Sequence, residues 1–189
     1  MTKANEIANN EMVDVDTTTG EIIESTLSYT IVNDTPDFTV IKLKNGEHEK
    51  LMKYKSISSF PTNTEVEQMK LFQLINADSE SDMIKALKEH KGKKIAIKNL
   101  MTSPYEKFDK VTGGAKRGVL TRFEDLDGNY YATSSKAVYF SVLNIVDTFG
   151  LPDTEKTKRA LEIKVNGKKQ LNGVQTLIEV VGFTDLKTK

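Results

Sequence analysis

The stretch GVLTRFEDLDGNYYATSSKAVYFSVLNIVDTFGLP, residues 118–152, decides the fold of this chain. Its first part has the composition of two short β-strands, residues 118–123 and 129–133, joined by Asp125-Leu126-Asp127-Gly128. Tight turns favour these residues, because aspartate bonds the local backbone and glycine accepts a positive φ. We therefore expect a hairpin here, and we interpret Asp125 and Asp127 as turn residues in preference to a cation site.

The second part of the stretch predicts the best-defined helix of the chain. Its apolar residues recur at i, i+4, i+7, i+8 and i+11, which places them on one helical face. We expect Ser134 or Ser135 to cap the start of this helix, and Gly150 and Pro152 to end it. The predicted buried face consists of Val138, Val142, Ile145, Val146 and Phe149.

An earlier helix is predicted from Thr64 to about Asn76. Thr64 and Glu67 match the capping-box pattern, in which the two side chains satisfy free backbone N–H groups of the first turn. A short helix is also expected at about residues 79–92, ending at Gly92. The side chains expected to be buried by the first helix are Val66, Met69, Phe72 and Ile75, and the second helix carries Met83, Ile84 and Leu87.

The remaining apolar segments predict further strands. A hairpin is expected from two of them around the turn at residues 33–37, and Asn166-Gly167 is a predicted turn near the C-terminus. The segment 50–58 is ambiguous, and residues 102–117 are expected to form a long loop because they contain Pro104, Gly113 and Gly114. The predicted strands are residues 28–32, 38–44, 93–100, 161–165 and 177–183.

This order of elements predicts an α+β fold, mainly antiparallel β. Strands and helices do not alternate as in parallel βαβ proteins, and about six strands with a late helix suit a small OB-fold-like barrel with inserted and C-terminal-half helices. Residues 1–25 contain six acidic residues and one basic residue and no apolar periodicity. We expect them to form a disordered, flexible acidic segment, followed by one domain over residues 26–189.

Composition excludes several classes of protein. The chain has no cysteine and no apolar run long enough to span a bilayer, and its first residues lack the apolar core of a secretory signal. This pattern predicts a cytoplasmic protein without disulfides. No nucleotide-binding or catalytic motif is present, and His48 and His90 have no neighbours at metal-ligand spacing. We therefore predict no catalytic residue, no metal site, no cofactor and no enzymatic activity.

Basic and aromatic residues are interleaved between positions 98 and 131. The chain has 27 basic and 27 acidic residues, yet residues 93–122 hold eight basic and only two acidic ones. Single-stranded nucleic acid requires this mixture, because cations neutralise phosphates and flat rings stack on unpaired bases. A second cluster of this kind lies at residues 42–55, and simple solvation of lysines is the alternative interpretation. The predicted nucleic-acid-binding residues are Lys98, Tyr105, Lys107, Phe108, Lys110, Lys116, Arg117, Arg122, Tyr130 and Tyr131.

Residues 93–152 also resemble a known family. Within them, residues 118–134 have the pattern of a hairpin whose turn contains aspartates and a glycine. The helix that follows ends with Ile145-Val146-Asp147-Thr148-Phe149-Gly150-Leu151-Pro152. This pattern is similar to small proteins encoded beside replication genes in phages and plasmids of Gram-positive bacteria, which are regarded as single-stranded-DNA-binding proteins. The resemblance covers about 60 of 189 residues. Many relatives carry an acidic C-terminal tail, whereas the acidic segment of this chain is N-terminal.

The resemblance implies an OB-like fold and a protein that coats and protects single-stranded DNA during replication or recombination, largely without regard to sequence. It leaves open RNA as a ligand, and replication or recombination proteins and further copies of the chain as partners; no membrane is expected as a partner. The alternative function is that of a phage factor that inhibits or recruits a host protein. Salt-sensitive binding of an oligonucleotide would separate the two functions.

Overall fold

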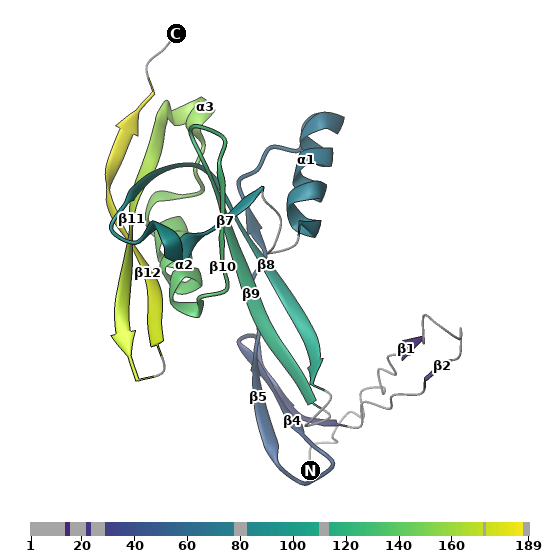
Figure 1. Ribbon diagram of the computed structural model, residues 1–189. Helices are drawn as coiled ribbons and strands as arrows, with labels where there is room; N and C mark the ends of the chain where they lie inside the picture. The colour runs from purple at the N-terminus through teal and green to yellow at the C-terminus, as the bar shows by residue number, and fades with distance from the viewer. Residues whose placement is uncertain are drawn as a thin grey trace. The chain divides into compact units, whose positions relative to one another are not determined.

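We analysed a computed structural model of the chain, which describes residues 14–15, 22–23, 29–77, 83–109, 114–171 and 173–186 (Figure 1). The chain divides into two compact units. Unit 1 consists of residues 1–53 and 106–116, and unit 2 consists of residues 54–105 and 117–189. The predicted domain boundary at residue 25 stays a prediction, because residues 16–21 and 24–28 lie outside the described part.

Unit 1 is built around a three-stranded antiparallel sheet. Its strands are β3 (Thr30–Asp34), β4 (Phe38–Lys42) and β5 (His48–Met52), in the order β3-β4-β5. This confirms the predicted hairpin around residues 33–37. A small core of Ile41, Leu43, Leu51 and Ala115 covers one face of the sheet. In the acidic N-terminal segment, β1 (Asp14–Val15) and β2 (Ile22–Ile23) pair antiparallel, a pairing that the sequence did not predict.

Unit 2 contains the large sheet of the protein. Its strand order is β12-β11-β8-β9-β10-β7, and the short β6 (Ile57–Ser58) pairs with β8. The β7–β10 pair is parallel, whereas β10 with β9, β11 with β8 and β12 with β11 are antiparallel. The bounds are β7 (Ile84–Ala86), β8 (Lys94–Asp109), β9 (Gly114–Asp125), β10 (Tyr130–Thr133), β11 (Arg159–Gln170) and β12 (Gly173–Asp185).

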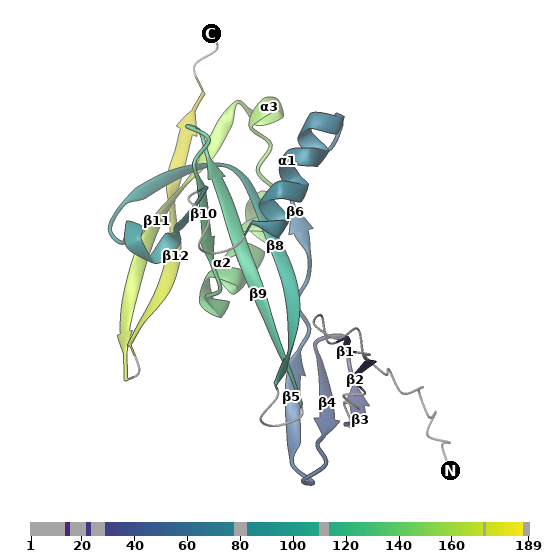
Figure 2. The ribbon, with the colours of Figure 1, turned by 45° about the vertical axis from the view of Figure 1, so that its right-hand side comes forward.

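The sheet curls around the helix α2 (Lys136–Phe149), as Figures 1 and 2 show. Val138, Val142 and Ile145 of α2 are buried against strand residues such as Ile97 and Phe123. This half-barrel with one internal helix confirms the α+β, OB-fold-like prediction. Most of the predicted helix face is correct, but Phe149 is 52% exposed. It lies at the C-terminal end of α2, where its ring meets the ring of Phe183 edge-on at 5.6 Å.

The predicted loop at residues 102–117 is wrong. Its described residues belong to the long neighbouring strands β8 and β9, which extend beyond the rest of the sheet. Proline lacks the backbone N–H that a central strand uses, but it is tolerated where one edge of a strand has no partner. The described partners of β8 on the side away from β9, namely β11 and β6, end at Thr102. Pro104 therefore fits in the strand just beyond them.

Two other local predictions are corrected. Residues 84–86 form strand β7 and Leu87–His90 form a short 3-10 helix, η1, where a helix was expected at 79–92; residues 78–82 lie outside the described part. Asn166 and Gly167 lie inside β11 instead of forming a turn. The ambiguous segment 50–58 contains the end of β5 and β6, and α3 (Thr154–Thr157) is a further short helix.

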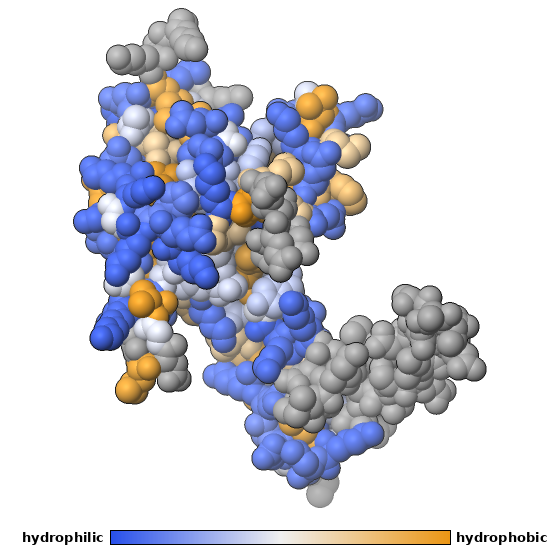
Figure 3. Space-filling model, viewed as in Figure 1, coloured by the Kyte–Doolittle hydropathy of each residue, from blue (hydrophilic) through white to orange (hydrophobic). Residues whose placement is uncertain are grey.

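The helix α1 (Glu65–Asn76) begins as predicted but packs through a different face. The capping box is present, with Thr64 Oγ1 accepting from the N–H of Glu67. Leu74 is buried with Ile84 and Met101, and Leu71 packs against them. The residues predicted to be buried, Val66, Met69, Phe72 and Ile75, are between 45% and 66% exposed. Apolar side chains of α1 are accordingly visible on the surface in Figure 3.

The two sides of α1 predict losses of stability of different size. We expect Leu74→Ala to lower the free energy of unfolding by about 2–4 kcal/mol, because it leaves a cavity in a packed site. Phe72 is 64% exposed, so Phe72→Ala should cost less than about 1 kcal/mol. Urea denaturation of both variants measures this difference. A larger loss for Phe72→Ala than for Leu74→Ala would show that the helix packs through its other side.

Candidate nucleic-acid interface

Tyr105 and Gly118 form a close contact on the strands β8 and β9 of unit 2. A Cβ atom added to Gly118 would overlap the ring atoms of Tyr105, so the ring lies directly over the glycine. Gly118 is buried beneath it, whereas the Tyr105 side chain remains 40% exposed. A glycine in a strand often marks such a close approach. The arrangement holds the phenol ring of Tyr105 against the backbone of Gly118, and the residue keeps part of its surface exposed.

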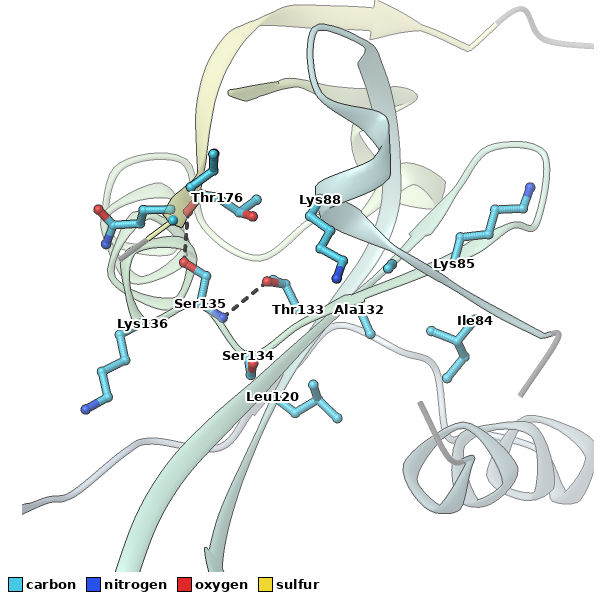
Figure 4. Close-up of a pocket in the computed structure, with 14 residues that line it drawn as sticks. Ile84, Lys85, Lys88, Leu120, Ala132, Thr133, Ser134, Ser135, Lys136 and Thr176 are labelled. Atoms are coloured by element: carbon cyan, nitrogen blue, oxygen red, sulfur yellow. Dashed lines mark hydrogen bonds between the residues drawn. The ribbon is translucent and has the colours of Figure 1, made fainter. Parts of the chain in front are cut away.

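The sheet face that carries Tyr105 continues toward β10 and β7. Side chains two positions apart on a strand share a face, so Leu120 lies on the same side of β9 as Gly118. Leu120 lies beside Ala132 in Figure 4. Lys98 is exposed and Arg117 is half-buried, on the same two strands within unit 2. Lys98 and Arg117 therefore both keep surface that a ligand could reach.

Tyr130 is half-buried and partly committed to the fold. It packs against the cluster of Leu74, Ile84 and Met101, and its hydroxyl donates to Glu124 at 3.5 Å. Burial, the negative charge of Glu124 and this hydrogen bond together raise the pKa of Tyr130. The Tyr130 hydroxyl therefore stays protonated at neutral pH. The residue is half-buried, so part of its surface remains exposed.

Arg122, one of the predicted DNA-binding residues, is buried in the structure. Its side chain is buried, with the residue only 3% exposed, and it donates to the backbone carbonyl of Ile75 at 3.0 Å and to Ser103 Oγ at 3.4 Å. Burial lowers the pKa of Arg122. The carbonyl of Ile75 lies in the last turn of α1, where helix carbonyls lack intrahelical partners. Arg122 therefore ties α1 to the sheet.

Tyr131, a second predicted binding residue, is also an interior residue of the structure. Neighbouring strand residues point to opposite faces, and Tyr131 takes the core side while Tyr130 takes the other. The Tyr131 hydroxyl donates to Asp125 Oδ2 at 2.8 Å. Burial first, then this hydrogen bond and the charges of Asp125 and Asp127, raise its pKa to about 12. Its ring is edge-on to His90 at 4.8 Å.

Asp125 organises the hairpin turn between β9 and β10. It accepts hydrogen bonds from the backbone N–H groups of Asp127 and Asn129, from the Asn129 side chain and from Tyr131. Burial alone would raise the pKa of this carboxyl, but these four sets of donors outweigh burial and hold it below the ordinary value. The predicted role of Asp125 as a turn residue is thus supported by its partners.

The other predicted residues fall in unit 1 or outside the described part. Lys107 and Lys116 are exposed residues of unit 1. Phe108 lies in β8 but its side chain is not described, and Lys110 lies outside the described residues. In the second basic cluster, Lys50 Nζ lies 3.8 Å above the ring of Phe38, and Lys53 forms an ion pair of 2.8 Å with Asp34.

A cleft that sequence reasoning missed lies in unit 2 (Figure 4). It has a volume of about 620 Å³ and includes Lys85, Lys88 and Lys136. Lys85 and Lys88 come from the adjacent elements β7 and η1, and Lys136 comes from α2. In the sequence, β8, β9 and β10 lie between η1 and α2. They lie outside the dense basic segment at residues 93–122, so local charge counting could not find them. Only the pairing of β7 with β10 brings them together.

The described residues contain no group of three or more histidine, aspartate or glutamate side chains arranged to hold a metal ion. No helix among them is both long enough and apolar enough to cross a bilayer.

Comparison with known proteins finds matches over most of the chain. A family model described as Phage Single-stranded DNA-binding protein matches residues 51–180, which include Tyr105, Gly118 and all residues of the cleft. The chain is also 31% identical over 167 residues to the Single-stranded DNA-binding protein of Bacillus phage GA-1. That alignment covers 87% of this chain and 96% of the relative. No solved structure matches the chain.

Proposed function

The chain belongs to the family of phage single-stranded DNA-binding proteins, and from this premise we propose that it binds single-stranded DNA largely without reading base sequence. The observation that supports this most directly is Tyr105, a residue that is 40% exposed and whose ring lies against Gly118. Unpaired bases stack on such rings whatever their identity, because every base has a flat aromatic face.

Duplex DNA offers no comparable contact. Its bases are stacked on one another, and the described part of unit 2 shows no exposed helix with the basic side chains that reading a major groove requires. In α1, Lys70 is the one basic residue, and in α2 it is Lys136. Preference for single strands follows from the exposed ring together with basic side chains such as the exposed Lys98 and the half-buried Arg117.

The biological role that we propose is binding without catalysis. The protein would coat and protect single strands during phage replication or recombination in the cytoplasm of the bacterial host, and replication or recombination proteins would be its partners. The residues that we retain for DNA contact in unit 2 are Lys98, Tyr105, Arg117 and Tyr130. Lys107, Phe108, Lys110 and Lys116 remain separate candidates near the ends of β8 and β9.

A fluorescent oligo-dT titration at two salt concentrations tests this function. We expect binding that weakens as salt rises, because neutralised phosphates release counterions. Duplex of the same length should bind more weakly, and mixed-sequence single strands should bind about as tightly as oligo-dT. Equal or tighter binding of duplex, or no binding of oligo-dT at low salt, would refute the proposal. An oligo-rU arm compares RNA with DNA.

The contact of Tyr105 with DNA has its own test. Tyr105→Ala should weaken oligo-dT binding by about 1–3 kcal/mol, the usual contribution of stacking on one base, while the salt dependence stays nearly unchanged because stacking releases no ions. Gly118→Ala should weaken binding in the same direction, since its new Cβ displaces the ring. Phe72→Ala, which removes an exposed ring from α1, serves as the control and should bind as the wild type. Wild-type affinity of Tyr105→Ala would remove this residue from the site.

A further inference from the structure

The cleft between β7, η1, β10, α2 and β12 has a strongly one-sided charge. Its 14 lining residues include Lys85, Lys88 and Lys136 and no aspartate or glutamate. The whole chain is electrically neutral, with 27 basic and 27 acidic residues, so a lining without any acid is a local departure from the average surface. The first turn of α2, which begins at the cleft, also contains no acidic residue. Such a lining attracts an anion.

The three lysines are not equivalent. Lys85 Nζ donates to Asn129 Oδ1 at 2.8 Å, so its ammonium is already used by the hairpin turn. Lys88 extends from η1 toward Thr133 in Figure 4, and Lys136 stands at the edge of the cleft at the first residue of α2. Within the described part of the chain, no hydrogen bond or ion pair joins the side chain of Lys88 or of Lys136 to another residue.

A fourth lysine lies next to the cleft. The stem of Lys91 crosses Gly167, where an added Cβ would come within 3.0 Å of Lys91 Cε and 2.9 Å of Val174 Cγ1. Gly167 is paired with Thr176, and Val174 and Thr176 both line the cleft. Lys91 therefore brings another ammonium to the same side of the sheet, and the absence of a side chain at Gly167 makes room for it.

The remaining lining combines hydroxyl groups with an apolar floor. Ser135 Oγ donates to the carbonyl of Thr176 at 2.8 Å, which fixes the start of α2 against β12, and the Ser135 N–H donates to Thr133 Oγ1 at 3.2 Å. Hydroxyl groups and lysines are the side chains that proteins use to contact phosphate oxygens. The apolar side chains of the lining are Ile84, Leu120, Ala132 and Val174, with Ala86 beside them.

This combination suits a ligand with an anionic part and an apolar part. We propose that the cleft binds a nucleotide of the single strand, with its phosphates against Lys88 and Lys136 and its base on the apolar floor. This inference rests on the proposed function and adds to it a second contact region. Leu120, two positions along β9 from Gly118, joins the cleft to the ring of Tyr105 on the same sheet face. Two positions on a strand span about 6.7 Å, so a single strand can reach both.

The test compares two double variants that each remove two positive charges. The cleft variant is Lys88→Gln with Lys136→Gln, which spares Lys85 and its bond to Asn129. The control variant is Lys70→Gln with Lys156→Gln, which changes exposed lysines of α1 and α3 that do not line the cleft. Both changes lie on the surface, so circular dichroism and melting temperature should match those of the wild type for both proteins.

We expect the cleft variant to bind oligo-dT at least about tenfold more weakly at low salt, and the slope of log affinity against log salt to fall by about 1.4, or 0.7 for each lost phosphate contact. The control variant should keep the wild-type affinity and slope. If the two variants weaken binding equally, the effect is one of net charge, and the cleft is not a site. Wild-type binding by the cleft variant would overturn the proposal as well.

Competition with a mononucleotide tests whether the phosphate bound in the cleft belongs to a DNA strand or to a free nucleotide. Thymidine monophosphate should not compete with oligo-dT at equal nucleotide concentration, because one phosphate releases few counterions. Tight thymidine monophosphate binding that is lost in the cleft variant, with oligo-dT binding unchanged, would make the cleft a mononucleotide site and overturn the proposal. Failure of the wild type to bind oligo-dT would instead refute the proposed function itself.

Discussion

Replacing Asp125 by alanine should lower the free energy of unfolding at neutral pH by about 3 kcal/mol, since the buried donors lose their acceptor. The carboxylate accepts from the backbone of Asp127 and Asn129 at 2.9 and 2.8 Å, and from the hydroxyl of Tyr131 at 2.8 Å. Tyr131 is only 6% exposed, so the loss of Asp125 leaves a largely buried hydroxyl without its acceptor. Urea denaturation measures the loss.

The same carboxylate predicts how stability depends on pH. Its pKa is lower in the folded chain than in the unfolded chain, so Asp125 stabilises the fold above the ordinary aspartate pKa of about 4. That contribution is lost as the pH falls from this value through the lower, folded-state pKa. The Asp125→Ala variant should therefore lose less stability than the wild type between neutral and acidic pH.

Asp127→Asn is the matched control for this prediction. Asp127 lies in the same turn but is exposed, and its backbone N–H, which the substitution keeps, is the group that donates to Asp125. We expect this variant to lose less than about 0.5 kcal/mol, as is usual for surface changes. If Asp127→Asn and Asp125→Ala were equally unstable, net charge at the turn would be responsible, and the buried hydrogen bonds would not be the cause.

Replacing Arg122 by alanine should destabilise the protein by about 2–4 kcal/mol, through the loss of a charged hydrogen bond and of a buried side chain. The guanidinium donates to the carbonyl of Ile75 at 3.0 Å, in the last turn of α1. That carbonyl and the adjoining sheet lose their connection in the variant. Hydrogen exchange should consequently show faster opening of α1 than of α2, whose packing does not involve Arg122.

The Arg122 variant also separates a structural role from a DNA-binding role. At temperatures where the variant remains folded, its oligo-dT affinity and salt slope should equal those of the wild type, because the buried guanidinium contacts no phosphate. Lys98→Ala is the matched control, since Lys98 is exposed and should not affect stability. A lower salt slope for folded Arg122→Ala would return this residue to the DNA-binding surface.

Two large apolar side chains of α1 are exposed. Met69 and Phe72 are 58% and 64% exposed, although their spacing suits a buried helix face. Solubility-enhancing changes at these two positions should thus leave both the fold and the contact of α1 with Arg122 intact.

Interactions between residues close in the sequence were sufficient to predict several elements. Thr64 and Glu67 determine the start of α1, and Gly128 with Asp125 determines the hairpin between β9 and β10, because caps and tight turns depend on residues a few positions apart. The apolar repeat of Val138, Val142 and Ile145 likewise determines both the existence of α2 and the face that it buries. The family pattern at residues 118–152 depends on these same local features.

Only the tertiary structure decided which side of each of several elements is buried. Long-range contacts select that side, whereas the sequence pattern leaves the two sides of a helix or strand equivalent. The Leu71 and Leu74 side of α1 is buried because it meets Ile84 and Met101, which are distant in the chain. Arg122 is interior because the last turn of α1 lies over it. Lys88 and Lys136 share one cleft because β7 pairs with β10, a parallel contact between segments about 45 residues apart, as Ile84 and Tyr130 are.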